Sequence, residues 1–414
     1  MDNNIERRKF LKGVGVGAVV GTLGTMGTLS LTGLGDIFKA EKELSKTKIG
    51  TVKKVTITNI SETSWFDNNT LVGDIKSAGG LLVNQYNFNW APFANGKGIG
   101  KGSYQEGIDA IAKYLPHDLD KAWEYAKANS VHPENAGGFS ALIDFVDMQD
   151  KSHKILLDSG WSYEWMESAF KREGIDKMLE NREIEALILS HEHFDHFWGL
   201  PVTLKYDPGI TIYIPEGFYE EGLDYIKKSG HTGKLITLKE GINTVYPGMA
   251  LYVFGIPIIT RVYGEQSLYF NVEDKGLVSV TGCCHQGIIQ FASTAINEIE
   301  YEKNTLHGIY GGLHISPFDD WDPKYDDLVF SLGDYGFEKI GCNHCTGLLT
   351  ANKFVSAGLP VVKGTARYGS KDTAYLGNGD TIEFGVKVAS AELEQEKAVS
   401  YNNDDTKDSG IVTY

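Results

Sequence analysis

IEALILSHEHFDH, residues 184–196, is the stretch that decides the fold. It begins as an apolar run of strand length and ends in four metal-binding side chains within six residues: His191, His193, Asp195 and His196. Alternate residues of an extended segment face the same side, so His191 and His193 can bind one ion together. Asp195 and His196 can reach a neighbouring ion as the chain turns into a helix. Imidazole suits zinc, iron or manganese, so the pattern predicts a centre of two divalent ions. A merely solvated polar segment is the alternative.

Strands and helices alternate on both sides of this motif, which predicts a layered α/β protein. The expected strands are 53–60, 139–146, 154–157, 184–189, 211–214, 234–238, 268–272, 277–281 and 308–311. The expected helices are 108–128, 161–181, 218–228, 288–299 and 326–335. A turn at 273–276 makes the strands on either side of it a hairpin.

One domain is expected over residues 50–390, followed by an acidic, loose tail at 391–414. Residues 75–133 are interpreted as an insertion over one edge of the core. Their aromatic side chains either stack on a flat substrate or simply pack: Tyr86, Phe88, Trp90 and Phe93. Stacking would make the insertion a roof over the site.

The motif and the segments around it resemble the metallo-β-lactamase superfamily, and in particular its dihydropterin-ribofuranosylaminobenzene-phosphate synthase-like branch. The segments that carry the resemblance are GFSAL (138–142), LDSG (157–160), EQSL (265–268), TGCCHQG (281–287), GGLH (311–314) and HCTG (344–347). The likeness spans about residues 50–390 without the insertion. It implies a four-layer αββα sandwich with metal ions at the edges of the sheets.

The resemblance also implies a set of metal ligands. They are His191, His193, Asp195, His196, His285 and His344. His191 and His193 would bind the first ion, and Asp195 and His196 the second. His344 matches the last metal histidine, while His285 would complete or bridge the pair. Asp195 is also the expected catalytic residue, orienting the nucleophilic water and accepting its proton.

Two positions depart from the superfamily pattern. Cys283 stands where a bridging aspartate is usual, and Glu265-Gln266 stands where a middle histidine is usual. Asp158 is expected to hydrogen-bond a ligand histidine and fix its tautomer. His314 is interpreted either as a ligand or as a residue that contacts substrate or supports a ligand.

The four cysteines form two pairs, each next to a histidine: Cys283 with Cys284, and Cys342 with Cys345. A disulfide framework would scatter its cysteines to join loops, so this placement indicates a site. Cys345, like Glu265 and Cys283, is expected to support a ligand or contact substrate. A four-thiolate zinc site, a redox pair or a disulfide between Cys342 and Cys345 are the alternatives.

The N-terminus indicates export. Arg7 and Arg8 are followed by Phe-Leu and by an uncharged stretch rich in glycine and threonine over 13–35, which is typical of a twin-arginine signal. We expect residues 1–45 to be signal and linker, read by the twin-arginine export machinery, and the protein to be periplasmic or extracytoplasmic. A membrane anchor is the alternative, because the stretch is long enough to span a bilayer. Its glycines and threonines make a stable membrane span unexpected.

The formal net charge of −16 argues against a nucleic-acid partner, because phosphate binding requires clustered Lys and Arg. The prediction is therefore an exported, metal-dependent hydrolase with two divalent ions, zinc before manganese or iron. It would act on a phosphoester, ester or related bond of a small molecule. The alternatives are a non-hydrolytic di-iron redox protein and a non-catalytic metal-binding module. All of this requires residues 191–196, 285 and 344 to converge.

Overall fold

The computed structural model describes residues 46–62, 137–258, 262–301, 305–317, 321, 324–370 and 372–385. The predicted export signal, the insertion at 75–133 and the tail from 391 lie outside these residues. No helix within the described ranges combines the length and apolar character needed to cross a bilayer.

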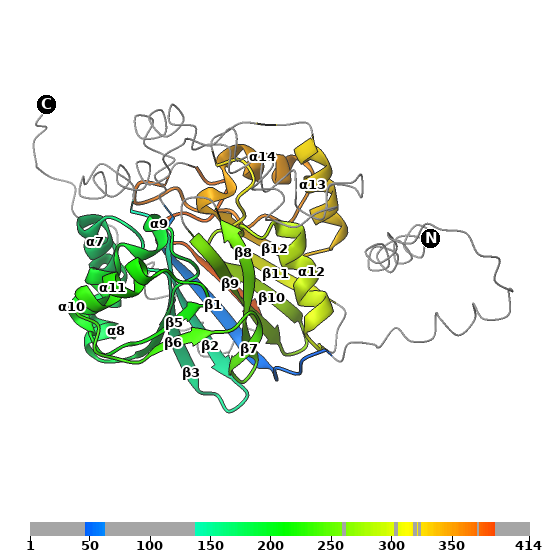
Figure 1. Cartoon of the computed structure of the whole chain (residues 1–414). Helices are drawn as coiled ribbons and strands as arrows, with labels where there is room; N and C mark the ends of the chain where they lie inside the picture. The colour runs from blue at the N-terminus through cyan, green and yellow to red at the C-terminus, as the bar shows by residue number, and fades with distance from the viewer. Residues whose placement is uncertain are drawn as a thin grey trace, which may run out of the picture. The chain divides into compact units, whose positions relative to one another are not determined.

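The strands form two half-sheets (Figure 1). The first half-sheet contains β1 (Val52–Ser61), β2 (Ser140–Asp147), β3 (Ser152–Leu157), β4 (Ile184–Ile188), β5 (Thr211–Pro215), β6 (Leu235–Leu238) and β13 (Thr381–Gly385). The second half-sheet contains β7 (Gly241–Tyr246), β8 (Met249–Ile258), β9 (Val262–Val272), β10 (Gly276–Thr281), β11 (Leu306–Gly312) and β12 (Lys339–Asn343). A parallel pairing of Val52 with Val272 joins β1 to β9 and connects the two halves.

Each half-sheet is antiparallel on one side and parallel on the other. Strands β3 to β6 run parallel in the first half-sheet, and β10 to β12 run parallel in the second. The carboxyl ends of parallel strands meet at one sheet edge, where α/β proteins commonly bind ligands. The segments that follow β3, β4, β10, β11 and β12 carry all the predicted site residues except Glu265, which lies within β9.

Helices cover the outer face of each half-sheet (Figure 1). The helices beside the first half-sheet are α7 (Tyr163–Glu173), α8 (Ile175–Glu180), α9 (Phe194–Phe197), α10 (Leu200–Tyr206) and α11 (Glu220–Lys228). Those beside the second are α12 (Ile288–Glu298), α13 (Lys324–Asp334), the 3₁₀ turn η5 (His344–Thr346) and α14 (Leu348–Ser356). The resulting order of layers is helix, sheet, sheet, helix.

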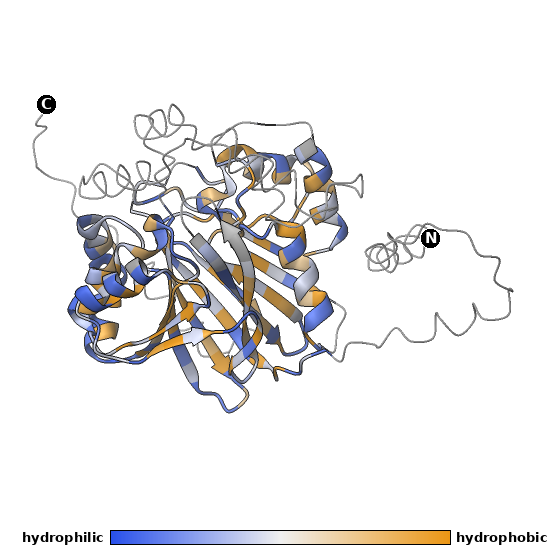
Figure 2. Ribbon diagram, viewed as in Figure 1, coloured by the Kyte–Doolittle hydropathy of each residue, from blue (hydrophilic) through white to orange (hydrophobic). Residues whose placement is uncertain are grey.

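Three apolar clusters hold these layers together, and β4 shows how the sequence builds them. Ala186 and Ile188 pack in the cluster between the two half-sheets, whereas Leu187 packs against the helices outside. Because both faces of β4 are buried, its sequence is a nearly continuous apolar run. Figure 2 shows the same apolar character along the strands of both halves. A third cluster lies beneath α12, α13 and α14.

The predicted α/β class is confirmed, and so is the antiparallel hairpin of β9 and β10. The single helix predicted over 161–181 is wrong, because the chain forms α7 and α8 with a break at Gly174. Gly174 has φ 70°, the left-handed conformation that ends one helix before the next begins. The apolar periodicity continues through the break, which is why the pattern suggested one helix.

Gly174 provides a test of this break. An added Cβ would meet no atom within 4 Å, so a substitution there reports backbone strain alone. We expect Gly174→Ala to lower the free energy of unfolding by about 1 kcal/mol, and Gly174→Asn by less, because asparagine tolerates left-handed φ. Chemical denaturation followed by circular dichroism measures both. Equal losses in the two variants would contradict the explanation.

Candidate metal centre

The first group of donors surrounds the end of β4. His191 Nε2 lies 3.0 Å from His193 Nδ1, and the ring centroid of His285 lies 4.8 Å from each of these rings. One ring nitrogen of each of the three histidines lies within 4.8 Å of the others. His285 thus joins His191 and His193 from the far half-sheet, where it follows β10.

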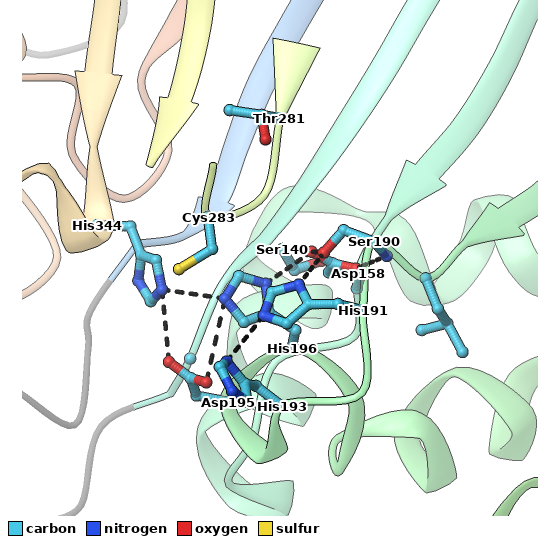
Figure 3. A network of polar contacts seen from close by, with 12 residues as sticks. Ser140, Asp158, Ser190, His191, His193, Asp195, His196, Thr281, Cys283 and His344 are labelled. Atoms are coloured by element: carbon cyan, nitrogen blue, oxygen red, sulfur yellow. Dashed lines mark hydrogen bonds and ion pairs between the residues drawn. The ribbon is translucent and has the colours of Figure 1, made fainter. Parts of the chain in front are cut away.

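The second group of donors lies beside the first. His196 Nε2 is 3.2 Å from His344 Nε2, and Asp195 Oδ2 is 3.4 Å from the same His344 nitrogen. These three donor atoms also lie within 4.8 Å of one another. In Figure 3 the His344 ring, from the end of β12, points at Asp195 and His196 from α9. The six predicted ligands therefore converge as two neighbouring triads, although their role as ligands stays a prediction.

The carboxylate of Asp158 supports one histidine of each triad, either directly or through Ser190. It accepts hydrogen bonds from the backbone N–H of Ser190 at 2.6 Å, from Ser190 Oγ at 2.6 Å and from His196 Nδ1 at 2.7 Å. Ser190 Oγ in turn lies 2.8 Å from His191 Nδ1. Burial raises the pKa of Asp158, and its contacts with His196 and Ser190 oppose that rise. One carboxylate thus orients a histidine of each triad (Figure 3).

Two of the other three histidines, His285 and His344, are held in a similar way. Glu265 Oε2 accepts the backbone N–H of His285 at 2.6 Å, and Glu265 Oε1 lies 3.3 Å from His285 Nδ1. His344 Nδ1 donates to the carbonyl oxygen of Glu62 at 3.2 Å. In His191, His196, His285 and His344, Nδ1 contacts the protein and Nε2 is left for the centre. A hydrogen bond at one ring nitrogen fixes the tautomer that binds a metal through the other.

The protonation states suit metal binding. Burial lowers the pKa of His191 and His314 well below the ordinary value, which keeps both rings neutral. Burial opposes ionisation of Asp195, but the charges on His196 and His344 hold its pKa below the usual range. Burial alone would lower the pKa of His344, yet the hydrogen bond with Asp195 raises it to about 9. The Asp195–His344 pair therefore requires a positive charge, which a proton or a metal ion can supply.

Two buried nitrogens point to a missing partner. The Nε2 atoms of His285 and His314 have no hydrogen-bond partner within the described residues. A buried polar atom without a partner is costly, because it loses its contact with water and gains nothing in return. Imidazole and carboxylate are the donors that zinc, iron and manganese take in proteins. The residues present therefore fit the divalent ions that the superfamily resemblance implies.

The cysteines divide into two kinds. Cys283 Sγ lies 3.0 Å from Cys345 Sγ and 3.4 Å from His314 Nδ1, inside the donor cluster. Cys284 and Cys342 pack instead in the apolar cluster under α12 to α14, and no candidate donor group in the described residues includes them. The alternative four-thiolate zinc site is therefore wrong. All four cysteines are free, so the alternative disulfide between Cys342 and Cys345 is absent as well.

The remaining predictions concern Glu265-Gln266 and the isolated histidines. Glu265 supports His285, while Gln266 Nε2 donates to the carbonyls of Leu189 and Tyr213 and so ties β9 to the first half-sheet. The described histidines that the sequence analysis left out have partners elsewhere: His153 with Asp147, His231 with the Ile210 carbonyl, and His307 with Glu338.

Strained backbone marks the strand ends around the centre. The non-glycine residues Asp158, Cys284, His314 and His344 have φ of 61°, 61°, 45° and 48°. Left-handed φ is uncommon outside glycine and gathers at functional sites, where the surrounding structure holds it in place. These turns aim short connections from β3, β10, β11 and β12 toward the centre.

Sequence reasoning missed Ser190 and the Glu62 carbonyl. Ser190 relays the orientation of Asp158 to His191, and its place directly before the motif was a usable signal. Glu62 contributes through a backbone atom, which residue identity does not reveal. Phe139, whose ring centroid lies 5.5 Å from those of His196 and His344, forms an apolar wall of the second triad.

Comparison with known proteins adds to this geometry. Residues 137–268 match the family model of the metallo-beta-lactamase superfamily. A 7,8-dihydropterin-6-methyl-4-(beta-D-ribofuranosyl)-aminobenzene-5'-phosphate synthase from Methanocaldococcus jannaschii is 26% identical over 254 residues, 53% of this chain and 83% of that protein. An uncharacterized protein from the same organism is 25% identical over 52% of this chain and 86% of its own length. Tm1679, a metal-dependent hydrolase of the beta-lactamase superfamily, has 21% identity and a TM-score of 0.45, covering 61% of this chain and 94% of Tm1679.

The layered fold and its buried donors define an αββα sandwich with a cluster of residues that could hold divalent metal ions. Over residues 137–268 the chain is similar to the metallo-beta-lactamase superfamily, and the synthase relative extends the likeness to about half of the chain.

The contacts of Asp158 lead to a prediction about metal affinity. Asp158→Asn keeps a side chain that tolerates φ 61° but removes the charge that orients His196 and Ser190. We expect the affinity for zinc to fall by about 10- to 100-fold, as for other residues that support a metal histidine.

Competition with a chromophoric chelator measures this affinity, and circular dichroism checks the fold. Asp150→Asn is the matched control, because Asp150 also has a left-handed φ of 64° but is exposed and pairs with Lys53. Unchanged affinity in Asp158→Asn would remove the supporting role.

Proposed function

We propose that this chain is a metal-dependent hydrolase that holds two divalent ions and cleaves a phosphoester, ester or related bond of a small molecule. The observation that carries the proposal is the pair of neighbouring donor triads. Each triad brings residues from both half-sheets to one sheet edge, and every histidine in them except His193 is fully or almost fully buried.

The first triad would hold one ion through His191, His193 and His285, and the second another through Asp195, His196 and His344. We propose zinc as the bound ion, because imidazole-rich sites suit it. Manganese and iron are the alternatives, and metal analysis of the purified protein distinguishes the three. When bound, the ions supply Lewis acidity, which polarises a substrate oxygen and makes water more acidic.

Asp195 is the proposed catalytic residue. Its Oδ2 faces His344 at 3.4 Å, while Oδ1 lies 4.0 Å from His196 Nε2. A carboxylate oxygen in this position can accept a hydrogen bond from the attacking water, orient it and take up its proton. Phe139 excludes bulk water from one side, which strengthens each of these electrostatic contacts.

The substrate is proposed only by class. A relative named as a synthase of a phosphorylated pterin compound supports a phosphorylated substrate, and group transfer would use the same residues as hydrolysis. An exported enzyme would meet a different small molecule from a cytoplasmic biosynthetic one. We therefore propose hydrolysis. Identifying the molecule that accepts the cleaved group distinguishes the two reactions: the acceptor is water in hydrolysis and another molecule in group transfer.

Substitution of Asp195 tests the mechanism. Asp195→Asn is expected to lower turnover of a chromogenic phosphodiester by about 100-fold or more, because a proton acceptor in the transition state is lost. Metal content is measured by mass spectrometry on the same sample. Asp144→Asn, on β2 and paired with Lys154, is the control and should keep full turnover. If Asp195→Asn, or the larger truncation Asp195→Ala, retained both full metal content and full turnover, the assignment would be wrong.

We also propose that the protein is exported in folded form by the twin-arginine machinery. The paired arginines and the uncharged stretch after them support this. Export of a folded chain suits a centre whose donors come from distant parts of the sequence.

Replacing the paired arginines tests the route. The double substitution Arg7→Lys and Arg8→Lys is expected to leave the protein in the cytoplasm, because the export receptor reads the arginine pair. Cell fractionation and immunoblotting measure the distribution, with Lys9→Arg as a control. Normal export of the double variant would exclude the twin-arginine route.

A further inference from the structure

Two thiols from separate strands meet inside the donor cluster. Cys283 follows β10, Cys345 lies in η5 after β12, and their sulfur atoms are 3.0 Å apart. Both side chains are buried, at 3% and 0% exposure, so this contact is part of the interior. From the sequence, both residues are expected to support a ligand or contact substrate, and only the four-thiolate alternative makes them metal ligands.

Cys283 lies among the nitrogens of both triads. Its sulfur atom groups with ring nitrogens of His191 and His196, and separately with those of His285 and His314, all within 4.8 Å. A third group joins it to Cys345 and His344 within the same limit. No other cysteine in the described residues has such neighbours.

The backbone is shaped to hold the second sulfur there. A Cβ on Gly312 would lie 2.6 Å from Cys345 Sγ and 3.2 Å from the His344 ring, so only glycine leaves the space that both side chains occupy. Cys345 Sγ also lies 3.5 Å from the carbonyl oxygen of Cys283. Cys345 Sγ is thus positioned by the end of β11 as well as by its own 3₁₀ turn, η5.

We propose that Cys283 and Cys345 are ligands of the metal centre and make it selective for thiophilic divalent ions. This deepens the proposed function and rests on it. On binding, each thiol releases its proton to the solvent and a sulfur lone pair forms the bond to the ion, so no electron is lost or gained. A buried thiol is only a weak hydrogen-bond donor, so packing alone gives little reason to place two of them among imidazoles.

Selectivity follows from the mixture of donors. Thiolate and imidazole favour zinc, cobalt and cadmium, whereas carboxylate and water favour magnesium and manganese. With sulfur at its centre, the site should discriminate against manganese, which an imidazole–carboxylate site would accept. His314 joins the same donor set through a ring nitrogen, and its Nδ1 lies 3.4 Å from Cys283 Sγ.

Cadmium is the probe for this proposal. The full-length protein is purified with reductant, stripped with a chelator and titrated with Cd²⁺, while sulfur-to-cadmium charge transfer is followed in the ultraviolet. Bound cadmium is counted by mass spectrometry. Cys283→Ser and Cys345→Ser remove the proposed ligands, and Cys284→Ala and Cys342→Ala are matched controls from the apolar cluster.

We expect a charge-transfer band that saturates with bound cadmium, loses roughly half or more of its intensity in each site variant and persists in both controls. In the wild type, the affinity for zinc should exceed the affinity for manganese by at least about 100-fold, as measured by competition. Cadmium bound without the band, no bound cadmium, or equal loss in the controls would overturn the proposal.

X-ray absorption of the zinc-loaded wild type needs no variant and so covers the case in which a variant fails to fold. Sulfur scatterers at about 2.3 Å from zinc are expected, and a shell of nitrogen and oxygen alone would overturn the assignment. The two proposals fail separately. If the enzyme turns over substrate but sulfur does not bind the metal, only the proposal of thiolate ligands is wrong. If sulfur binds the metal but no substrate is turned over, only the proposed hydrolase activity is wrong.

Discussion

The site depends on the carboxylate of Asp158, which connects the ends of β3 and β4. It accepts the N–H and the hydroxyl of Ser190 and the Nδ1–H of His196, all within 2.7 Å. Through Ser190 it also fixes His191, so one buried charge sets the orientation of a donor in each triad. The left-handed backbone at Asp158 lets a single residue turn the end of β3 toward all three contacts.

Because the site is buried, each of its polar groups needs a partner within the protein or a bound ligand. Neutral imidazoles at His191 and His314 stand beside the charged Asp195–His344 pair, and bulk water does not reach them. A cluster of polar donors is stable in such surroundings only when each donor has a partner. The protein satisfies the outer nitrogens with Asp158, Glu265 and the Glu62 carbonyl, and the inner ones face a common centre.

Much of this was readable from the sequence. The apolar run ending in the 191–196 motif predicted β4, the layered α/β class and four of the donors, because strand period and ligand chemistry are local properties. His285 and His344 required the family resemblance, since no local pattern links residues that only tertiary packing brings together. The 3.0 Å approach of Cys283 to Cys345 could not be predicted, because it depends on the register of β10, β11 and β12 and on the space beside Gly312. The break at Gly174 was missed because apolar periodicity does not register a change in φ.

The connection between the half-sheets has a consequence for how the centre is assembled. Val52 and Val272 provide the register between β1 and β9, while His196 and His344, 148 positions apart, must approach to 3.2 Å. Neither half carries a complete triad of donors, so both proposed ion sites are complete only after the halves have docked. In the proposed metal centre, each bound ion would therefore link the two halves, so metal binding would stabilise the docked arrangement.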